Sequence, residues 1–108
     1  MTLDESTFES LADTTLAHLF DTIDEVLGDQ IDVDLEGGIL TLELDSGGQY
    51  VINKHAPNRQ IWVSSPKSGA SHYDHRDGRW IGTRDGADLQ TLLAAELAAL
   101  TGTRVDLG

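Results

Sequence analysis

Apolar residues recur at three- and four-residue steps from the start of the chain up to Gly28. This spacing predicts one long amphipathic helix that ends at the glycine, with Thr2 and Glu5 forming a capping box at its start. The apolar positions of this helix are Phe8, Leu11, Ala12, Leu16, Leu19, Phe20, Ile23 and Leu27.

A second helix is predicted near the C-terminus, where Asp88 fits an N-cap and Gly102 fits a C-terminal stop. Its leucine stripe consists of Leu89, Leu92, Leu93, Leu97 and Leu100. The tail that follows, residues 103–108, is expected to pack along the core through Val105 and Leu107.

Between the helices, residues 31–36 alternate strictly between apolar and acidic, which is the pattern of a half-buried strand. Gly37 and Gly38 then form a two-residue hairpin turn. This turn pairs Ile31 with Leu44 and places the apolar side chains of both strands on one face.

Further strands are expected at residues 50–54 and 60–64, separated by a break at 56–58, and around Tyr73 and Trp80. Strands joined by short turns cannot run parallel, so the sheet is antiparallel with about five to seven strands. Both helices are expected to cover one face of it, which is an α+β fold of the two-layer sandwich type. At 108 residues, without a repeat or linker, the chain is predicted to form a single domain over residues 1–108.

Charge is distributed unevenly along the chain. The first 45 residues contain 13 acidic side chains and no Lys or Arg, whereas all seven basic residues lie from Lys54 onward. A localised carboxylate surface favours cations or basic protein partners and argues against nucleic acid, whose phosphates it would repel. Apolar runs are too short to cross a membrane. General acidity that keeps a protein solvated in salt is the alternative explanation.

Carboxylates gather on the outward arc of the first helix, on the following turn and on one face of the first strand, so they are expected to form one acidic ridge. The candidate metal ligands are Asp13, Asp21, Asp24, Glu25, Asp29, Asp32 and Asp34. Carboxylate-only ligation favours Ca²⁺, Mg²⁺, Mn²⁺ or iron over zinc, and an exposed ridge is expected to bind weakly. A purely solvated acidic face is the alternative interpretation.

Residues 60–64 also alternate, with Ile61 and Val63 placed between Gln60, Trp62 and Ser64. If Ile61 and Val63 face the helices, Trp62 must face the uncovered side of the sheet. An exposed Trp among amides is typical of an interaction hot spot, and the alternative is that it covers a sheet edge or a loop. The candidate partner-binding residues are Asn53, Lys54, Gln60, Trp62 and Ser64.

The histidines and the known catalytic motifs do not point to a further metal site or to an enzyme. His72 and His75 are three apart in a predicted strand and should point to opposite faces, so a shared metal is not expected. His18 is either a surface residue or an accessory ligand. The chain has no cysteine, nucleophile elbow, P-loop or dinucleotide motif, so nothing in it requires an enzyme.

Several stretches are recognisable together, above all Tyr-Val-Ile-Asn-Lys at residues 50–54 and Pro-Asn-Arg-Gln-Ile-Trp-Val-Ser-Ser-Pro at residues 57–66. With Gly-Ile-Leu-Thr-Leu at 38–42 and the acidic first helix, they make the chain resemble the frataxin family, including its bacterial CyaY members, over nearly its whole length. It departs from the family at His55, where glutamine is usual, at His72, where some members have a basic residue, and at Ala70, where proline is frequent.

The resemblance implies the same two-layer fold and a role in iron–sulfur cluster assembly. It implies that the acidic ridge binds Fe²⁺ or Fe³⁺ weakly and meets basic surface on a cysteine desulfurase. It also implies that Asn53, Gln60 and Trp62 contact the desulfurase and the scaffold protein near the sulfur-transfer site.

The function expected from this resemblance is an iron-binding regulator of sulfur transfer on the desulfurase–scaffold complex, without catalytic residues of its own. The rival is an iron chaperone or store with weak ferroxidase activity. The protein is expected to be a monomer that can oligomerise with iron. Its expected location is the bacterial cytoplasm or, for a processed eukaryotic form, the mitochondrial matrix.

Overall fold

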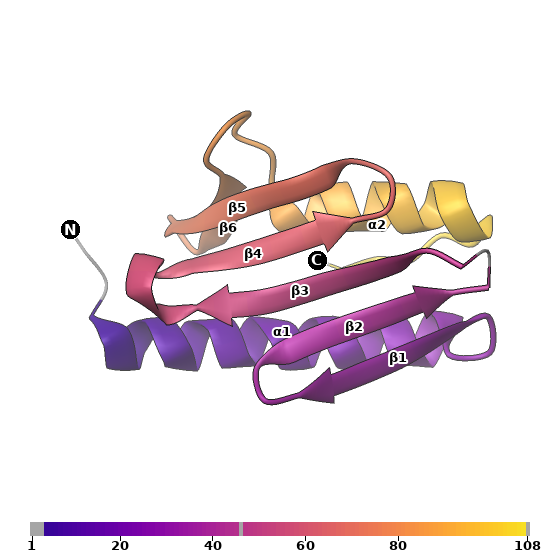
Figure 1. Ribbon diagram of the computed structural model, residues 1–108, viewed down its shortest axis with the longest axis horizontal. Coiled ribbons are helices and arrows are strands. Elements are labelled where there is room, and N and C mark those ends of the chain that lie inside the picture. The colour runs from indigo at the N-terminus through magenta and orange to yellow at the C-terminus, as the bar shows by residue number, and fades with distance from the viewer. Residues whose placement is uncertain (1–3, 46, 108) are drawn as a thin grey trace.

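The computed structural model describes residues 4–45 and 47–107. Its elements are α1 (Glu5–Leu27), β1 (Ile31–Glu36), β2 (Ile39–Leu44), β3 (Gln49–His55), the short 3-10 helix η1 (Ala56–Asn58), β4 (Gln60–Ser65), β5 (Gly69–Arg76), β6 (Arg79–Gly82) and α2 (Leu89–Thr101). The six strands form one antiparallel sheet in sequence order. Both helices lie on the same face of this sheet (Figure 1), so the predicted α+β sandwich is confirmed.

The β1–β2 hairpin has the predicted register. Ile31 lies opposite Leu44 and Val33 opposite Leu42. Gly37 and Gly38 both have positive φ, 59° and 78°, which the two-residue turn requires and which glycine adopts without steric cost. One face of each strand therefore turns to the helices and the other turns to solvent.

The helix boundaries differ slightly from the prediction. The N-cap of α1 is Asp4, whose Oδ1 accepts a hydrogen bond from the backbone N–H of Thr7 at 2.7 Å. The predicted cap Thr2 lies outside the described residues. In α2 both predictions are confirmed, because Asp88 Oδ2 accepts from the N–H of Thr91 at 3.0 Å and Gly102 adopts a φ of 75°.

The core fills the space between the sheet and the two helices. The tail runs between the helices (Figure 1) and buries Val105 and Leu107, as predicted. His18 Nε2 lies 3.0 Å from the carbonyl oxygen of Leu107, so this side chain ties α1 to the tail. Neither helix is long and apolar enough to span a membrane.

The predicted buried stripe of α2 was wrong at one position, Leu100. Leu100 is 42% exposed, whereas the acidic Glu96 is only 5% exposed and faces the sheet. The helix is rotated so that Glu96 meets hydroxyl groups at the ends of β3 and β4, and these partners compensate for its burial.

Candidate functional site

The uncovered face of the sheet carries a strip of uncharged residues in its centre. Ile61 and Val63 are buried against the helices, so Gln60, Trp62 and Ser64 point the other way. Asn53 of β3 lies directly opposite Trp62. We call Asn53, Gln60, Trp62 and Ser64 the tryptophan strip.

Trp62 is held by hydrogen bonds as well as by its strand. Its Nε1–H donates to Oε1 of Gln60 at 2.9 Å, and Nε2 of Gln60 donates to Oδ1 of Asp74 on β5 at 3.0 Å. This chain of bonds crosses from β4 to β5 and fixes the orientation of the indole.

Two histidines lie against the indole of Trp62. The ring of His55 stacks on it with a centroid distance of 3.7 Å and an angle of 9° between the planes. The ring of His72 stacks on it at 4.2 Å and 11°. Both histidines depart from the family pattern, but the sequence predicts no role for them, because only the pairing of β3, β4 and β5 brings them to Trp62.

Lys54 does not belong to this strip. It has the same strand parity as the buried Tyr50 and Ile52 and therefore points to the helix side. Its Nζ pairs with Oδ1 of Asp13 on α1 at 2.9 Å, and this hydrogen bond raises the pKa of Lys54 above its usual value. Of the five predicted partner-binding residues, the structure thus brings four together and separates Lys54.

The acidic ridge is exposed along its whole length but is split between two layers. Asp21, Asp24 and Glu25 lie on the solvent side of α1, whereas Asp32 and Asp34 point away from the helices on the uncovered sheet face. Among residues 4–45 and 47–107, no three His, Asp or Glu side chains converge in a way that could hold a metal ion. The ridge therefore offers dispersed carboxylates, and its role as a ligand set stays a prediction.

The uncovered sheet face has an uneven charge. The outward positions of β1 and β2 include Asp32, Asp34, Glu36 and Glu43. The outward positions of β3 and β4 are Gln49, Val51, Asn53, His55, Gln60, Trp62 and Ser64, without a carboxylate. A partner that covers this face therefore meets a negative border beside a nearly neutral centre.

The buried carboxylate of Glu96 on α2 is hydrogen-bonded to the end of β4, on the helix side of the sheet. Oε1 of Glu96 accepts hydrogen bonds from the hydroxyls of Tyr50 and Ser65, and Oε2 accepts from Ser68, each at 2.7 Å. Burial alone would raise the pKa of Glu96, but the bonds from Ser65, Ser68 and Tyr50 outweigh it and hold this pKa below its usual value. The burial of Glu96 was not predicted from the sequence, because an acid between Leu93 and Leu97 shows no pattern that identifies its partners.

His75 packs against Trp80 rather than against Trp62. His75 contacts Trp80 edge to face with a centroid distance of 5.0 Å, on the helix side of the sheet, while His72 is on the uncovered side. The predicted opposite orientation of His72 and His75 is confirmed.

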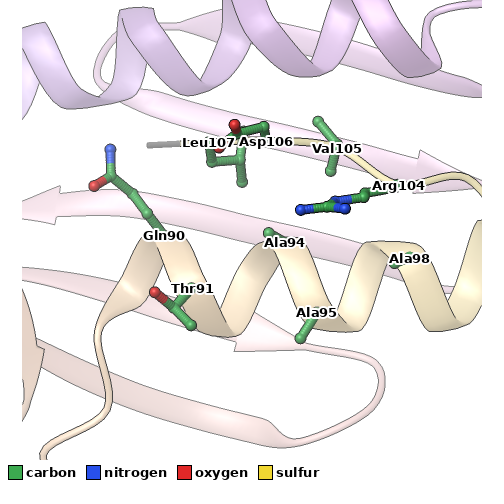
Figure 2. A pocket seen from close by; sticks show the side chains of 9 residues that line it. All are labelled: Gln90, Thr91, Ala94, Ala95, Ala98, Arg104, Val105, Asp106 and Leu107. Carbon is green, nitrogen blue, oxygen red and sulfur yellow. The ribbon is translucent and has the colours of Figure 1, made fainter.

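A groove of about 460 Å³ lies between α2 and the tail. Figure 2 shows that Ala94 and Ala98 of α2 face Arg104 and Val105 across it. None of its lining residues belongs to the ridge or to the strip, so it adds nothing to the candidate site.

Comparison with known proteins decides the family. The model of the Frataxin-like domain matches residues 1–103, which is nearly the whole chain. The chain belongs to the frataxin family. The resemblance noted in the sequence is thereby confirmed.

Two frataxin-family relatives show how far the similarity extends. The chain is 46% identical over 111 residues to the mitochondrial frataxin of Arabidopsis thaliana, covering 97% of this chain but only 59% of that protein's length. It is 36% identical over 103 residues to the iron-sulfur cluster assembly protein CyaY of Neisseria meningitidis serogroup B, covering 95% of this chain and 94% of the relative.

Solved frataxin structures agree with the fold. A frataxin from Psychromonas ingrahamii superposes with a TM-score of 0.89 at 31% identity, over 98% of this chain and 99% of the other. A trimeric frataxin from Saccharomyces cerevisiae, complexed with ferrous iron, gives a TM-score of 0.79 at 37% identity, over 95% and 90% of the two chains.

Proposed function

We propose that this frataxin-family protein is an iron-binding regulator of iron–sulfur cluster assembly that modulates sulfur transfer on a cysteine desulfurase–scaffold complex. The observation that best supports an interaction role is the tryptophan strip. It combines an ordered aromatic side chain with amides and a hydroxyl on a sheet face that no helix covers. Charge-poor centres with Trp are typical of protein interfaces. The Neisseria relative carries cluster assembly in its name.

The acidic ridge would serve this function in two ways. Its exposed carboxylates would bind Fe²⁺ or Fe³⁺ weakly, because separated oxygen ligands neither enclose a cation nor select among cations. The same charge would steer a basic surface of the desulfurase towards the protein and so raise the association rate. Iron is the cargo or effector in this scheme, and the chain itself supplies no nucleophile or general base.

A second candidate is an iron chaperone or store with weak ferroxidase activity. It is favoured by one observation, namely that a trimeric yeast frataxin of the same fold was solved as a complex with ferrous iron. Under this reading the chain, a monomer without iron, would oligomerise when it binds iron. Its place of action would be the bacterial cytoplasm or the mitochondrial matrix, in line with the two relatives.

The experiment that tests the proposed function is partner binding by Trp62→Ala. Loss of a hot-spot Trp is expected to weaken the complex with desulfurase and scaffold by about 2 kcal/mol or more, about 30-fold in Kd. Thr41→Ala, on the same sheet face but over β2, is the matched control and should bind as the parent does.

Urea unfolding of the same variant distinguishes an interface residue from a core residue. The Trp62 side chain is half-buried. Its truncation should therefore lower the free energy of unfolding by clearly less than the roughly 3–5 kcal/mol that is lost when a core aromatic is truncated. A variant that is strongly destabilised but binds its partners normally would contradict the proposal.

A further inference from the structure

Three aromatic rings form a continuous stack across three strands of the uncovered sheet face. His72 of β5 lies directly opposite Trp62 of β4, whereas His55 of β3 reaches Trp62 from the diagonal position, since its own partner is Gln60. Both imidazoles are nearly parallel to the indole, at 9° and 11°. Opposite and diagonal neighbours are within reach of aromatic side chains in antiparallel sheets.

The stack occupies both faces of the indole. The hydrogen bond from Nε1 to Gln60 occupies its only polar group. With an imidazole on each face and Nε1 bonded to Gln60, we expect a partner to meet the ring edge of Trp62. His55 Nδ1 is buried without a hydrogen-bond partner, so stacking rather than hydrogen bonding through this atom holds the imidazole in place.

We propose that His55 and His72 are positioning residues that clamp the indole of Trp62 in one orientation and present it edge-on to the partner. The identity of the partner rests on the proposed function, whereas the clamp itself rests only on the observed stacking. A side chain already fixed in its bound orientation loses less conformational entropy on binding, which increases affinity without any new contact. The partner must then offer a narrow apolar pocket for a ring edge, because no indole face is free to stack on an aromatic side chain.

The clamp is tested first in the isolated protein. The chain has two tryptophans and two tyrosines, so a Trp80→Phe background with excitation selective for tryptophan makes Trp62 the only residue observed. Time-resolved fluorescence anisotropy separates local indole motion in the sub-nanosecond range from overall tumbling. Replacing both histidines by Ala should raise the amplitude of the sub-nanosecond component by about twofold or more, since exposed side chains reorient on that timescale.

Two controls keep this measurement decisive. His55→Phe with His72→Phe restores flat rings and should return the anisotropy to that of the parent, whereas Thr41→Ala should leave it unchanged. If Trp80→Phe does not fold, protein labelled with 5-fluorotryptophan gives a resolved fluorine resonance for each Trp, and the linewidth of the Trp62 resonance reports the same motion. Unchanged indole motion in the double Ala variant would overturn the clamp.

The second test measures binding to the desulfurase–scaffold complex in a double-mutant cycle. Ordering one side chain corresponds to about a 2- to 12-fold change in Kd, which is the loss expected for the double Ala variant. The same histidine substitutions should have no further effect in a Trp62→Ala background. A loss of equal size in that background would mean that the histidines touch the partner themselves, and the positioning role would be wrong.

The two tests fail separately. If the parent protein does not bind the desulfurase–scaffold complex at all, the proposed function falls, while the anisotropy result still decides whether His55 and His72 clamp Trp62.

Discussion

Glu96 offers the sharpest test of how the fold supports the tryptophan strip. Its carboxylate accepts three hydrogen bonds of 2.7 Å, and Ser65 Oγ in turn accepts the backbone N–H groups of Lys67 and Ser68 at 3.0 and 3.1 Å. The group therefore fastens α2 to the end of β4 and to the β4–β5 turn that follows Ser65. Replacing it should weaken both global stability and this turn.

The magnitude follows from the three bonds. A hydrogen bond to a charged group contributes about 1.5–3 kcal/mol against about 0.5–1.5 kcal/mol for a neutral pair, so Glu96→Gln removes roughly 1 kcal/mol per bond. An amide is easier to bury than a carboxylate, which offsets part of this loss. The expected net destabilisation is about 1–3 kcal/mol. Glu96→Ala leaves the buried hydroxyls of Tyr50 and Ser65 without an acceptor and should cost more, about 3–5 kcal/mol.

The assay is urea unfolding at several pH values, with the exposed Glu25→Gln as control, which should stay within about 0.5 kcal/mol of the parent. Because the pKa of Glu96 is lowered in the folded state, its contribution is present above the unfolded value of 4.5 and is lost as pH falls through the folded pKa. The difference in unfolding free energy between the parent and Glu96→Gln should therefore begin to shrink as the pH falls below 4.5. Above pH 10 the parent should also lose stability, because burial, followed by the bond to Glu96, raises the pKa of Tyr50 in the folded state.

Two results would refute this reasoning. One is a Glu96→Gln variant as stable as Glu25→Gln at pH 7. The other is a stability difference that persists unchanged at pH 3, which would show that packing rather than the ionised carboxylate carries the effect. Hydrogen exchange of the Lys67 and Ser68 amides provides a local check and should be faster in Glu96→Ala.

Three further predictions concern other parts of the molecule. Changing Asp21, Asp24 and Glu25 to Lys should abolish most weak iron binding in calorimetry without lowering the thermal midpoint at low salt, because like-charge repulsion on α1 is relieved; unchanged iron binding would remove the ridge as the site. Gly102→Ala should destabilise by about 1 kcal/mol in urea because of the positive φ, whereas Gly102→Asn should cost less; equal costs would argue against the backbone explanation. Leu107→Ala should cost about 2–5 kcal/mol in urea, since this tail residue is 1% exposed; a cost near zero would show that the tail does not hold the core.

Periodicity was sufficient for most of the fold. The strict alternation of residues 31–36 left one register that buries every apolar side chain of the hairpin, and that register is observed. The same alternation placed Trp62 on the uncovered face. It also could have placed Lys54 on the helix side, because Tyr50, Ile52 and Lys54 share one parity.

Features that depend on pairing between distant segments could not be predicted in this way. The positions of His55 and His72 against Trp62 depend on the registers of two hairpins, β3–β4 and β4–β5. The burial of Glu96 depends on hydroxyls from β3, β4 and the following turn, 28 to 46 residues away in sequence. A single helix pattern carries no information on such partners, so the leucine stripe of α2 predicted no role for the acid within it.

The central claim is that this protein acts on sulfur transfer through the tryptophan strip, and the most direct measurement is the rate of sulfide release by a cysteine desulfurase with its scaffold. The rate is measured with and without this protein, each with added Fe²⁺ and with a chelator. We predict that the parent changes the rate in the presence of chelator and that Trp62→Ala loses this effect while Thr41→Ala keeps it. A rate that this protein leaves unchanged unless iron is present would contradict the account and favour the iron chaperone.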